Sequence, residues 1–218
     1  QRQMCIRDSL QYYKDTEWKN CTPATASDFS AIAYYFGKML RDSLNVPVGL
    51  ICNAVGGSPT EAWVDRASLE YQFPAILKDW TKNDFIQEWV RGRAALNIKK
   101  SANSQQRHPY EPCYLYESGI RPLEQYPIRG VIWYQGEFNS GGSAKEYATL
   151  FSRMITDWRE KWGIGDFPFV YVQLPNFEPV DQEPSVEGNG WRWVREGQLK
   201  ALNLPNTAMA VTIDVGDP

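Results

Sequence analysis

The sequence has only one histidine, His108, in 218 residues. This scarcity limits the possible chemistry, because Ser-His and Cys-His catalysis both need an imidazole beside the nucleophile. His108 opens the segment HPYEP, in which Pro109 and Pro112 exclude a regular helix. From the residues alone, His108 can be a catalytic base, a packing residue or a hydrogen-bond partner near a bound substrate.

Other classes of protein are excluded by what the sequence lacks. There is no excess of basic residues, and the net charge of -3 argues against a nucleic-acid partner. No apolar run approaches the roughly eighteen residues that a membrane-spanning helix needs. The cysteines form no CxxC pair, and their wide spacing predicts free or buried thiols instead of a metal site or a disulfide framework. They are Cys5, Cys21, Cys52 and Cys113.

The bulk composition is that of a globular protein. Hydrophobic residues make up 43% and charged residues 22% of a chain long enough for one domain with a full core. Aromatic residues reach 14%, including nine Trp and twelve Tyr. Large cores use such rings, and carbohydrate-binding proteins use them as flat apolar platforms. The aromatic content by itself therefore leaves both interpretations open.

The groups best suited to chemistry follow a short apolar run at residues 130–134. Its β-branched and aromatic residues are typical of a buried strand in a parallel sheet. Directly after it come Gln135, Glu137 and Asn139, crowded around Gly136. Ligands of open α/β sheets bind at the carboxyl ends of strands, so these amide and acid side chains are candidate site residues. The simpler interpretation is a strand followed by a polar turn.

A second run, residues 47–54, leads directly into Gly56 and Gly57. We predict a second buried strand here. A glycine pair after a parallel strand exposes backbone N–H groups at the carboxyl edge of the sheet, where they suit an oxyanion or a phosphate. An ordinary tight turn before a helix explains the pair equally well.

The remaining pattern alternates helices with strands. Helices are expected over residues 29–43, 143–162 and 193–202, with a helical or mixed region over 65–100. Further strands are expected over 167–174 and 207–213, and Asp214 follows the last one. Apolar strands that alternate with helices predict an α/β fold of three layers, a parallel sheet with helices on both faces. Residues 1–10 show no clear period, and we interpret them as a junction outside this fold.

Seven segments, taken together and in order, resemble the sialate O-acetylesterase family within the SGNH-type hydrolases. The resemblance extends over nearly all of residues 18–218 and implies a flavodoxin-like sheet. The matching segments are FSAIAYYFGKML, VPVGLICNAVGGSPTEAW, LYESGIRPL, IRGVIWYQGEFN, YATLFSRMITDWREKWG, FPFVYVQLPNF and TIDVGDP.

The resemblance implies a serine esterase that removes O-acetyl groups from a sugar, typically a sialic acid, without a metal or cofactor. By motif position, Gly57 would give an oxyanion N–H, and Gln135 or Asn139 would add a side-chain donor. Glu137 would be the acid that orients the histidine, or a support of the floor of the site. Four more residues are expected to contact the substrate: Gly56, Trp133, His108 and Asp214.

The sequence also departs from the family. The family's nucleophile lies in a GQSNM-like motif on a first strand, and its histidine follows the DVGDP-like segment; this sequence contains neither. The resemblance therefore implies that residues 11–218 are a partial catalytic domain, incomplete at both ends and inactive alone. Four serines lie near motifs, none of them in a G-x-S-x-G elbow, and we expect a turn role even for Ser58. They are Ser30, Ser58, Ser118 and Ser140.

Two other functions compete with the esterase. A glycoside hydrolase would pair Glu137 with a second carboxylate near a strand end, the candidates being Glu178, Asp214 and Asp217. A sugar-binding module would instead present coplanar indoles on an open surface, with no polar pocket at Gly57 and Gln135. Its candidates are Trp63, Trp133, Trp191 and Trp193. The cysteines leave the compartment open, and the resemblance makes a secreted or periplasmic location an expectation.

Overall fold

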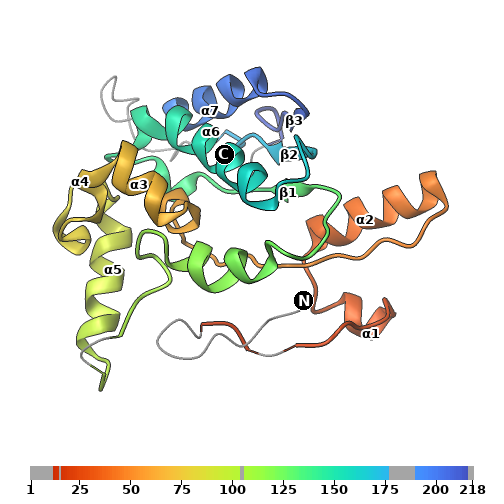
Figure 1. Ribbon diagram of the computed structural model, residues 1–218, viewed down its shortest axis with the longest axis horizontal. Helices are drawn as coiled ribbons and strands as arrows, with labels where there is room; N and C mark the ends of the chain where they lie inside the picture. The colour runs from red at the N-terminus through yellow and green to blue at the C-terminus, as the bar shows by residue number, and fades with distance from the viewer. Residues whose placement is uncertain (1–11, 15, 104–105, 177–189, 216–218) are drawn as a thin grey trace.

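A three-stranded parallel sheet lies at the centre of the computed structural model, which describes residues 12–14, 16–103, 106–176 and 190–215 (Figure 1). The strands β1 (Val131–Trp133), β2 (Phe169–Val172) and β3 (Thr207–Ala210) lie in the order β1-β2-β3. Val131 pairs with Phe169, and Phe169 pairs with Thr207. The predicted parallel sheet is confirmed, and the predicted junction at residues 1–10 lies outside the described residues.

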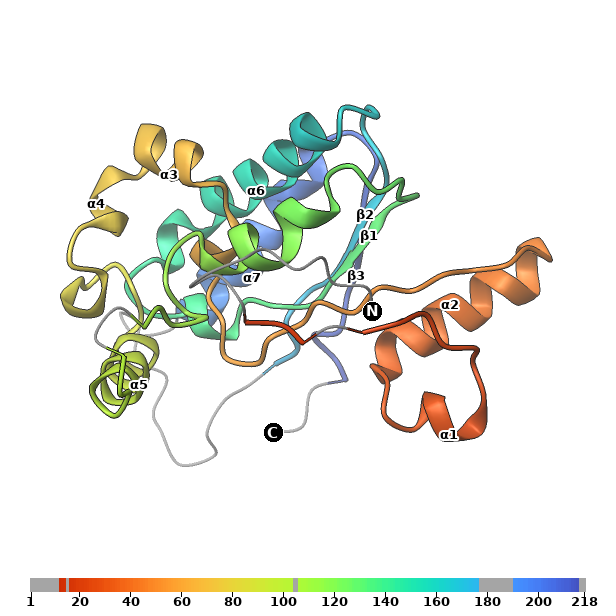
Figure 2. The same cartoon turned by 60° about the horizontal axis from the view of Figure 1, so that its bottom comes forward.

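Two helices connect these strands and lie side by side on one face of the sheet (Figures 1 and 2). Helix α6 (Tyr147–Trp162) joins β1 to β2, and α7 (Gly190–Lys200) joins β2 to β3. Crossovers between parallel strands are right-handed, so consecutive strand order puts both helices on the same side. Helix α6 ends at Gly163, whose φ of 62° is the left-handed conformation that glycine adopts without strain.

The core fills the space between this sheet face and the two helices. Phe169 and Tyr171 of β2 are almost fully buried, and the ring of Phe151 from α6 meets the ring of Tyr171 edge-on at 5.1 Å. On the opposite face, Val172 is half-buried and Ala208 is exposed. The fold is thus an open parallel α/β sheet, and α6 and α7 cover one of its faces. Helical cover of the other face stays a prediction.

The predicted buried strand at residues 47–54 is wrong. The segment takes part in no sheet ladder within the described residues, and its side chains are half-buried or exposed. Side chains fix it instead: Asn53 Nδ2 donates to Gly119 O at 2.6 Å, and Tyr13 Oη donates to Asn53 O at 2.9 Å. An apolar, β-branched run favours extended backbone, but a strand also needs a neighbour that accepts its N–H groups.

The other helices lie before β1. Ser30 caps α2, which confirms the helix expected over residues 29–43, and the mixed region at 65–100 forms three helices. None of the described helices is both long and apolar enough to cross a membrane. The α-helices are α1 (Pro23–Ala26), α2 (Ala31–Leu44), α3 (Arg66–Gln72), α4 (Pro74–Leu77) and α5 (Glu88–Lys99). Short helical turns are η1 (Thr60–Trp63), η2 (Trp80–Lys82), the buried π-helical η3 (Tyr116–Ile120), η4 (Arg121–Leu123), η5 (Glu137–Asn139), η6 (Ala144–Glu146) and η7 (Ala201–Asn203).

Candidate functional site

The floor of the candidate site is a buried amide, Asn139, at the end of η5. Its Oδ1 accepts three hydrogen bonds: from Thr60 N and Thr60 Oγ1, both at 2.9 Å, and from Gln135 Nε2 at 2.7 Å. A backbone N–H can only donate, so the bond from Thr60 N fixes which way the amide points. The turn after the glycine pair and the loop after β1 are therefore held together by one fully buried side chain.

The other end of the Asn139 amide faces a carboxyl group. Asn139 Nδ2 donates to Glu61 Oε2 at 2.9 Å and to Ser143 Oγ at 3.3 Å. Glu61 has no exposed surface, and burial raises the pKa of its carboxyl group, an effect that the bond from Asn139 opposes. Its second oxygen, Oε1, has no hydrogen-bond partner in the described part of the chain. Glu61 was not predicted, because nothing in the segment TEAW marks its acid as buried.

The two predicted loops meet through Gln135. Its Nε2 donates to Ser58 O at 3.2 Å as well as to Asn139, and its Oε1 lies 2.7 Å from Thr60 Oγ1, whose single proton it shares with Asn139 Oδ1. Ser58 follows Gly57 directly, so the glycine pair and the loop after β1 lie at the same edge of the sheet. The structure thus brings Gly57 and Gln135 together, and their shared role in a site stays a prediction.

A glutamine from α7 that was not predicted holds the strand ends together. Gln198 Oε1 accepts from Leu174 N at 2.9 Å, while its Nε2 donates to Gln135 O and Val172 O, both at 3.2 Å. Gln198 is fully buried, so it pins the carboxyl ends of β1 and β2 without contact with solvent. A signal existed in the sequence, because Gln198 falls on the buried face of α7 together with Val194 and Gly197.

The glycine pair presents a free backbone donor. Gly57 has a φ of 80°, and a Cβ at this position would overlap Tyr110 Oη, which itself donates to Gly56 O at 3.0 Å. Glycine is therefore required here for both conformation and space. The N–H of Gly57 makes no hydrogen bond within the described residues. A free N–H at the sheet edge suits a negatively charged oxygen.

Glu137 opens η5, the turn after β1, and is half-buried. In the described part of the chain its carboxylate takes part in no hydrogen bond or ion pair, unlike the buried Glu61. The floor is formed by Asn139, Thr60 and Glu61. The carboxylate of Glu137 is therefore available to accept a hydrogen bond from a donor outside these residues.

His108 is a packing residue here. Its Nδ1 accepts from Tyr110 N at 3.1 Å, and its Nε2 lies 3.1 Å from Asn97 Nδ2. Burial, aided by the nearby positive charge of Arg93, lowers the pKa of His108 to about 4. The ring stands edge-on to Tyr110 with the centroids 4.6 Å apart. The contact with Tyr110 links His108 to the glycine pair, and its contact with substrate stays a prediction.

Serine and cysteine side chains provide no nucleophile among the described residues. Ser58 Oγ donates to Val55 O at 2.7 Å and accepts from Trp63 Nε1 at 2.9 Å, which confirms its turn role. Burial raises the pKa of the Cys113 thiol to about 12, so it stays protonated at neutral pH. The thiols of Cys21, Cys52 and Cys113 are free, and Cys5 lies outside the described residues. The other three serines near motifs bond to backbone: Ser30 as the cap of α2, Ser118 to Tyr114 O and Ser140 to Glu137 O.

The predicted substrate contact of Trp133 needs correction. Its ring lies in the aromatic core, perpendicular to Trp63 at 5.7 Å and to Trp158 at 5.8 Å, so it packs the helix-covered face of the sheet. Two perpendicular core indoles also fail to form the coplanar surface that a sugar-binding module would need. Asp214 is exposed in the turn after β3, at the predicted edge. Glu178 and Asp217, candidates for a second hydrolase carboxylate, lie outside the described residues.

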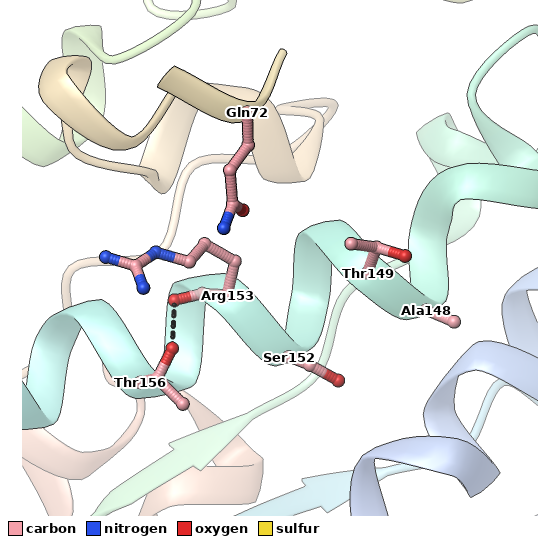
Figure 3. A pocket seen from close by; sticks show the side chains of 6 residues that line it. All are labelled: Gln72, Ala148, Thr149, Ser152, Arg153 and Thr156. Atoms are coloured by element: carbon pink, nitrogen blue, oxygen red, sulfur yellow. Dashed lines mark hydrogen bonds between the residues drawn. The ribbon is translucent and has the colours of Figure 1, made fainter. Parts of the chain in front are cut away.

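A shallow surface pocket of about 410 Å³ lies elsewhere, between α3 and the outer side of α6 (Figure 3). None of its lining residues belongs to the polar network. Its only cation, Arg153, already pairs with Asp157 and Glu160. The pocket is therefore not part of the candidate site. It is lined by Gln72, Ala148, Thr149, Ser152, Arg153 and Thr156.

Comparison with known proteins agrees with this geometry. A family model described as carbohydrate esterase, sialic acid-specific acetylesterase, matches residues 9–217. The chain belongs to this family. The sialate O-acetylesterase of Homo sapiens is 30% identical over 95% of this chain, and that of Rattus norvegicus is 29% identical over 86%. The crystal structure of a carbohydrate acetylesterase from Xanthomonas citri is 37% identical over 93% of this chain, with a TM-score of 0.70.

Family membership confirms the resemblance seen in the motifs and disfavours the glycoside hydrolase and the sugar-binding module. The chain spans only 37–38% of the length of these acetylesterases. In the part that it shares with the family, the described residues supply a free Gly57 N–H, an unpaired Glu137 carboxylate and a rigid polar floor. The described residues contain no cluster of His, Cys, Asp and Glu arranged to hold a metal ion.

Proposed function

We propose that the protein carrying this chain is a serine-type carbohydrate esterase that removes O-acetyl groups from a sialic acid or a related sugar. The observation that carries the proposal is the N–H of Gly57, which has no hydrogen-bond partner among the described residues and precedes Ser58, the residue that Gln135 binds at the carboxyl edge of the sheet. An ester hydrolase needs such a fixed donor because negative charge develops on the carbonyl oxygen in the transition state. Membership of the acetylesterase family supports the same chemistry.

The reaction would proceed in two steps. A serine oxygen attacks the acetyl carbonyl carbon while a histidine takes the serine proton, and the sugar hydroxyl leaves with that proton. Water then cleaves the acetyl-serine ester and releases acetate. The serine and histidine belong to motifs that this sequence does not contain, so this chain contributes the oxyanion donor, the acid and the floor.

Each described residue has a distinct role in this proposal. The Gly57 N–H binds the oxyanion. The Glu137 carboxylate has no other bond among the described residues, so it is available to orient the histidine. Both N–H groups of Gln135 and of Asn139 already bond to protein acceptors. Gln135 can add a second oxyanion donor only by giving up its 3.2 Å bond to Ser58 O, whereas Asn139 holds the floor.

The test is release of acetate from O-acetylated sialic acid by the full-length protein. We expect steady turnover, and we expect residues 1–218 alone to show none, because an oxyanion donor without an activated serine gives only residual catalysis. Turnover by residues 1–218 that is abolished by Ser58→Ala or His108→Ala would place the catalytic pair inside this chain. Absence of acetate release by the full-length protein would refute the proposed function.

A further inference from the structure

Three aromatic rings from different parts of the chain meet beside the glycine pair. The Trp89 ring on α5 lies 4.7 Å from the ring of Phe138, centroid to centroid, and 6.2 Å from that of Tyr110. A Cβ built on Gly57 would lie 3.4 Å from Trp89 Cζ3. Trp89 and Tyr110 therefore border Gly57, whose backbone donor the proposed function assigns to the oxyanion, and Phe138 packs against Trp89.

Trp89 is not required to hold α5 in place. The helix is anchored by Val90 and Ala94, which are both fully buried, whereas 50% of the Trp89 side chain is exposed despite its two ring contacts. Core indoles of this protein behave differently, since Trp63 and Trp158 are each only 4% exposed. An indole that is fixed by neighbouring rings and still open to solvent is suited to bind a ligand at little cost in side-chain entropy.

We infer that Trp89, supported by Phe138 and Tyr110, forms a binding subsite for the sugar ring of the substrate. The inference rests on the proposed function, because it takes the Gly57 N–H as the donor that binds the acetyl oxygen. The sugar is joined to the acetyl carbonyl carbon through one ester oxygen. Its ring therefore lies a few bonds from the carbonyl oxygen that binds the Gly57 N–H. The C–H groups on one face of a sugar ring pack on the apolar surface of an aromatic ring.

The subsite predicts a difference between two substrates of the full-length protein. With O-acetylated sialic acid, Trp89→Ala raises KM about tenfold, the loss expected for one aromatic contact, and changes kcat little. With ethyl acetate, which has no ring to bind, the same variant keeps kcat/KM within about twofold of the wild-type value. Trp89→Phe retains an aromatic surface, so its KM for O-acetylated sialic acid lies between the values for the wild type and for Trp89→Ala. Equal losses on both substrates, or no loss on the sugar ester, would overturn the inference.

Trp193→Ala is the matched control. Trp193 is 48% exposed and lies on α7. The Lys145 ammonium group lies over its ring, 5.8 Å from the ring centroid, and the ring is not one of the three in the cluster. We expect this variant to leave both substrates unaffected. If Trp193→Ala raised KM for the sugar ester as much as Trp89→Ala does, the effect would not be specific to Trp89. The subsite would then be refuted.

A binding measurement separates this inference from the proposed function. Titration of unmodified sialic acid into the wild-type protein, followed by NMR saturation transfer, needs no turnover. Contact that is lost in Trp89→Ala supports the subsite even if the protein releases no acetate. Equal contact in both proteins, or none in the wild type, overturns the subsite whatever the esterase assay shows.

Discussion

Residues 47–63 and residues 130–139 have the same sequence plan, an apolar run that leads into a polar turn, yet only one run becomes a strand. Residues 131–133 pair with β2, whereas residues 47–54 have no ladder partner among the described residues and are fixed through Asn53. The turns that follow nevertheless meet, because Thr60 and Gln135 share the buried oxygen of Asn139. Hydrogen bonds made by the turn after an apolar segment can therefore fix the position of that turn, even where the segment itself does not pair with a β-strand.

The two turns also differ in what they contribute. Residues 55–63 contribute backbone, the N–H of Gly57, and a buried acid, Glu61. Residues 135–139 contribute side chains: Glu137, whose carboxylate has no partner among the described residues, and Asn139, which forms the floor. The predictions below test this division from the largest expected effect to the smallest.

Glu137→Gln should have the largest effect, because it removes the negative charge proposed to orient the histidine. We expect kcat of the full-length protein to fall on the order of 10³-fold or more, with KM and the unfolding midpoint nearly unchanged. Steady-state kinetics and thermal unfolding measure the two. A folded variant with normal kcat would remove Glu137 from the mechanism, and an unfolded one would assign it to the floor.

Gly57→Ala should lower kcat/KM about 100-fold, the effect of disturbing one oxyanion donor. The added methyl group also meets Tyr110 Oη and a φ of 80°, so we expect a stability loss of about 1–2 kcal/mol in denaturant unfolding. Gly56→Ala is the stability control, because no atom lies within 4 Å of its Cβ position. If Gly57→Ala behaves like Gly56→Ala in unfolding, Gly57 is not conformationally required.

Asn139→Ala should cost about 3–4 kcal/mol of unfolding free energy, since it leaves Thr60 N, Gln135 Nε2 and Glu61 without their buried partner. Asn53→Ala is the matched change in the other segment, where the amide is half-buried and donates one bond, and it should cost about 1 kcal/mol. Urea unfolding of both variants compares them directly. Equal costs would show that the unpaired segment is held as firmly as the floor.

His108 should make stability depend on pH. Its folded-state pKa of about 4 lies below the ordinary value of 6.5, so the neutral ring favours the folded state. This contribution is fully present above pH 6.5 and is lost as the pH falls toward 4, by on the order of 2–3 kcal/mol. His108→Gln should not show this loss. Urea unfolding at pH 7 and pH 4.5 measures it, and parallel pH profiles for the two proteins would contradict the assignment.

Local patterns were sufficient for much of this protein. The 3.6-residue period of α6 and the apolar runs of β1, β2 and β3 appear in the structure close to where the sequence predicts them. The polar residues after β1 were predictable as well, because the carboxyl edge of a parallel sheet is exposed at each strand end. These features depend on neighbours within a few residues along the chain.

Only the tertiary structure decided which of these groups meet. Gln198 contacts Gln135 across 63 residues of chain, Asn139 contacts Glu61 across 78, and Trp89 reaches Gly57 from a helix with no evident chemistry in its sequence. The same long-range packing left residues 47–54 without a ladder and placed the Trp133 ring in the core. A side chain's period fixes the face on which it lies, but its hydrogen-bond partner depends on how distant elements pack.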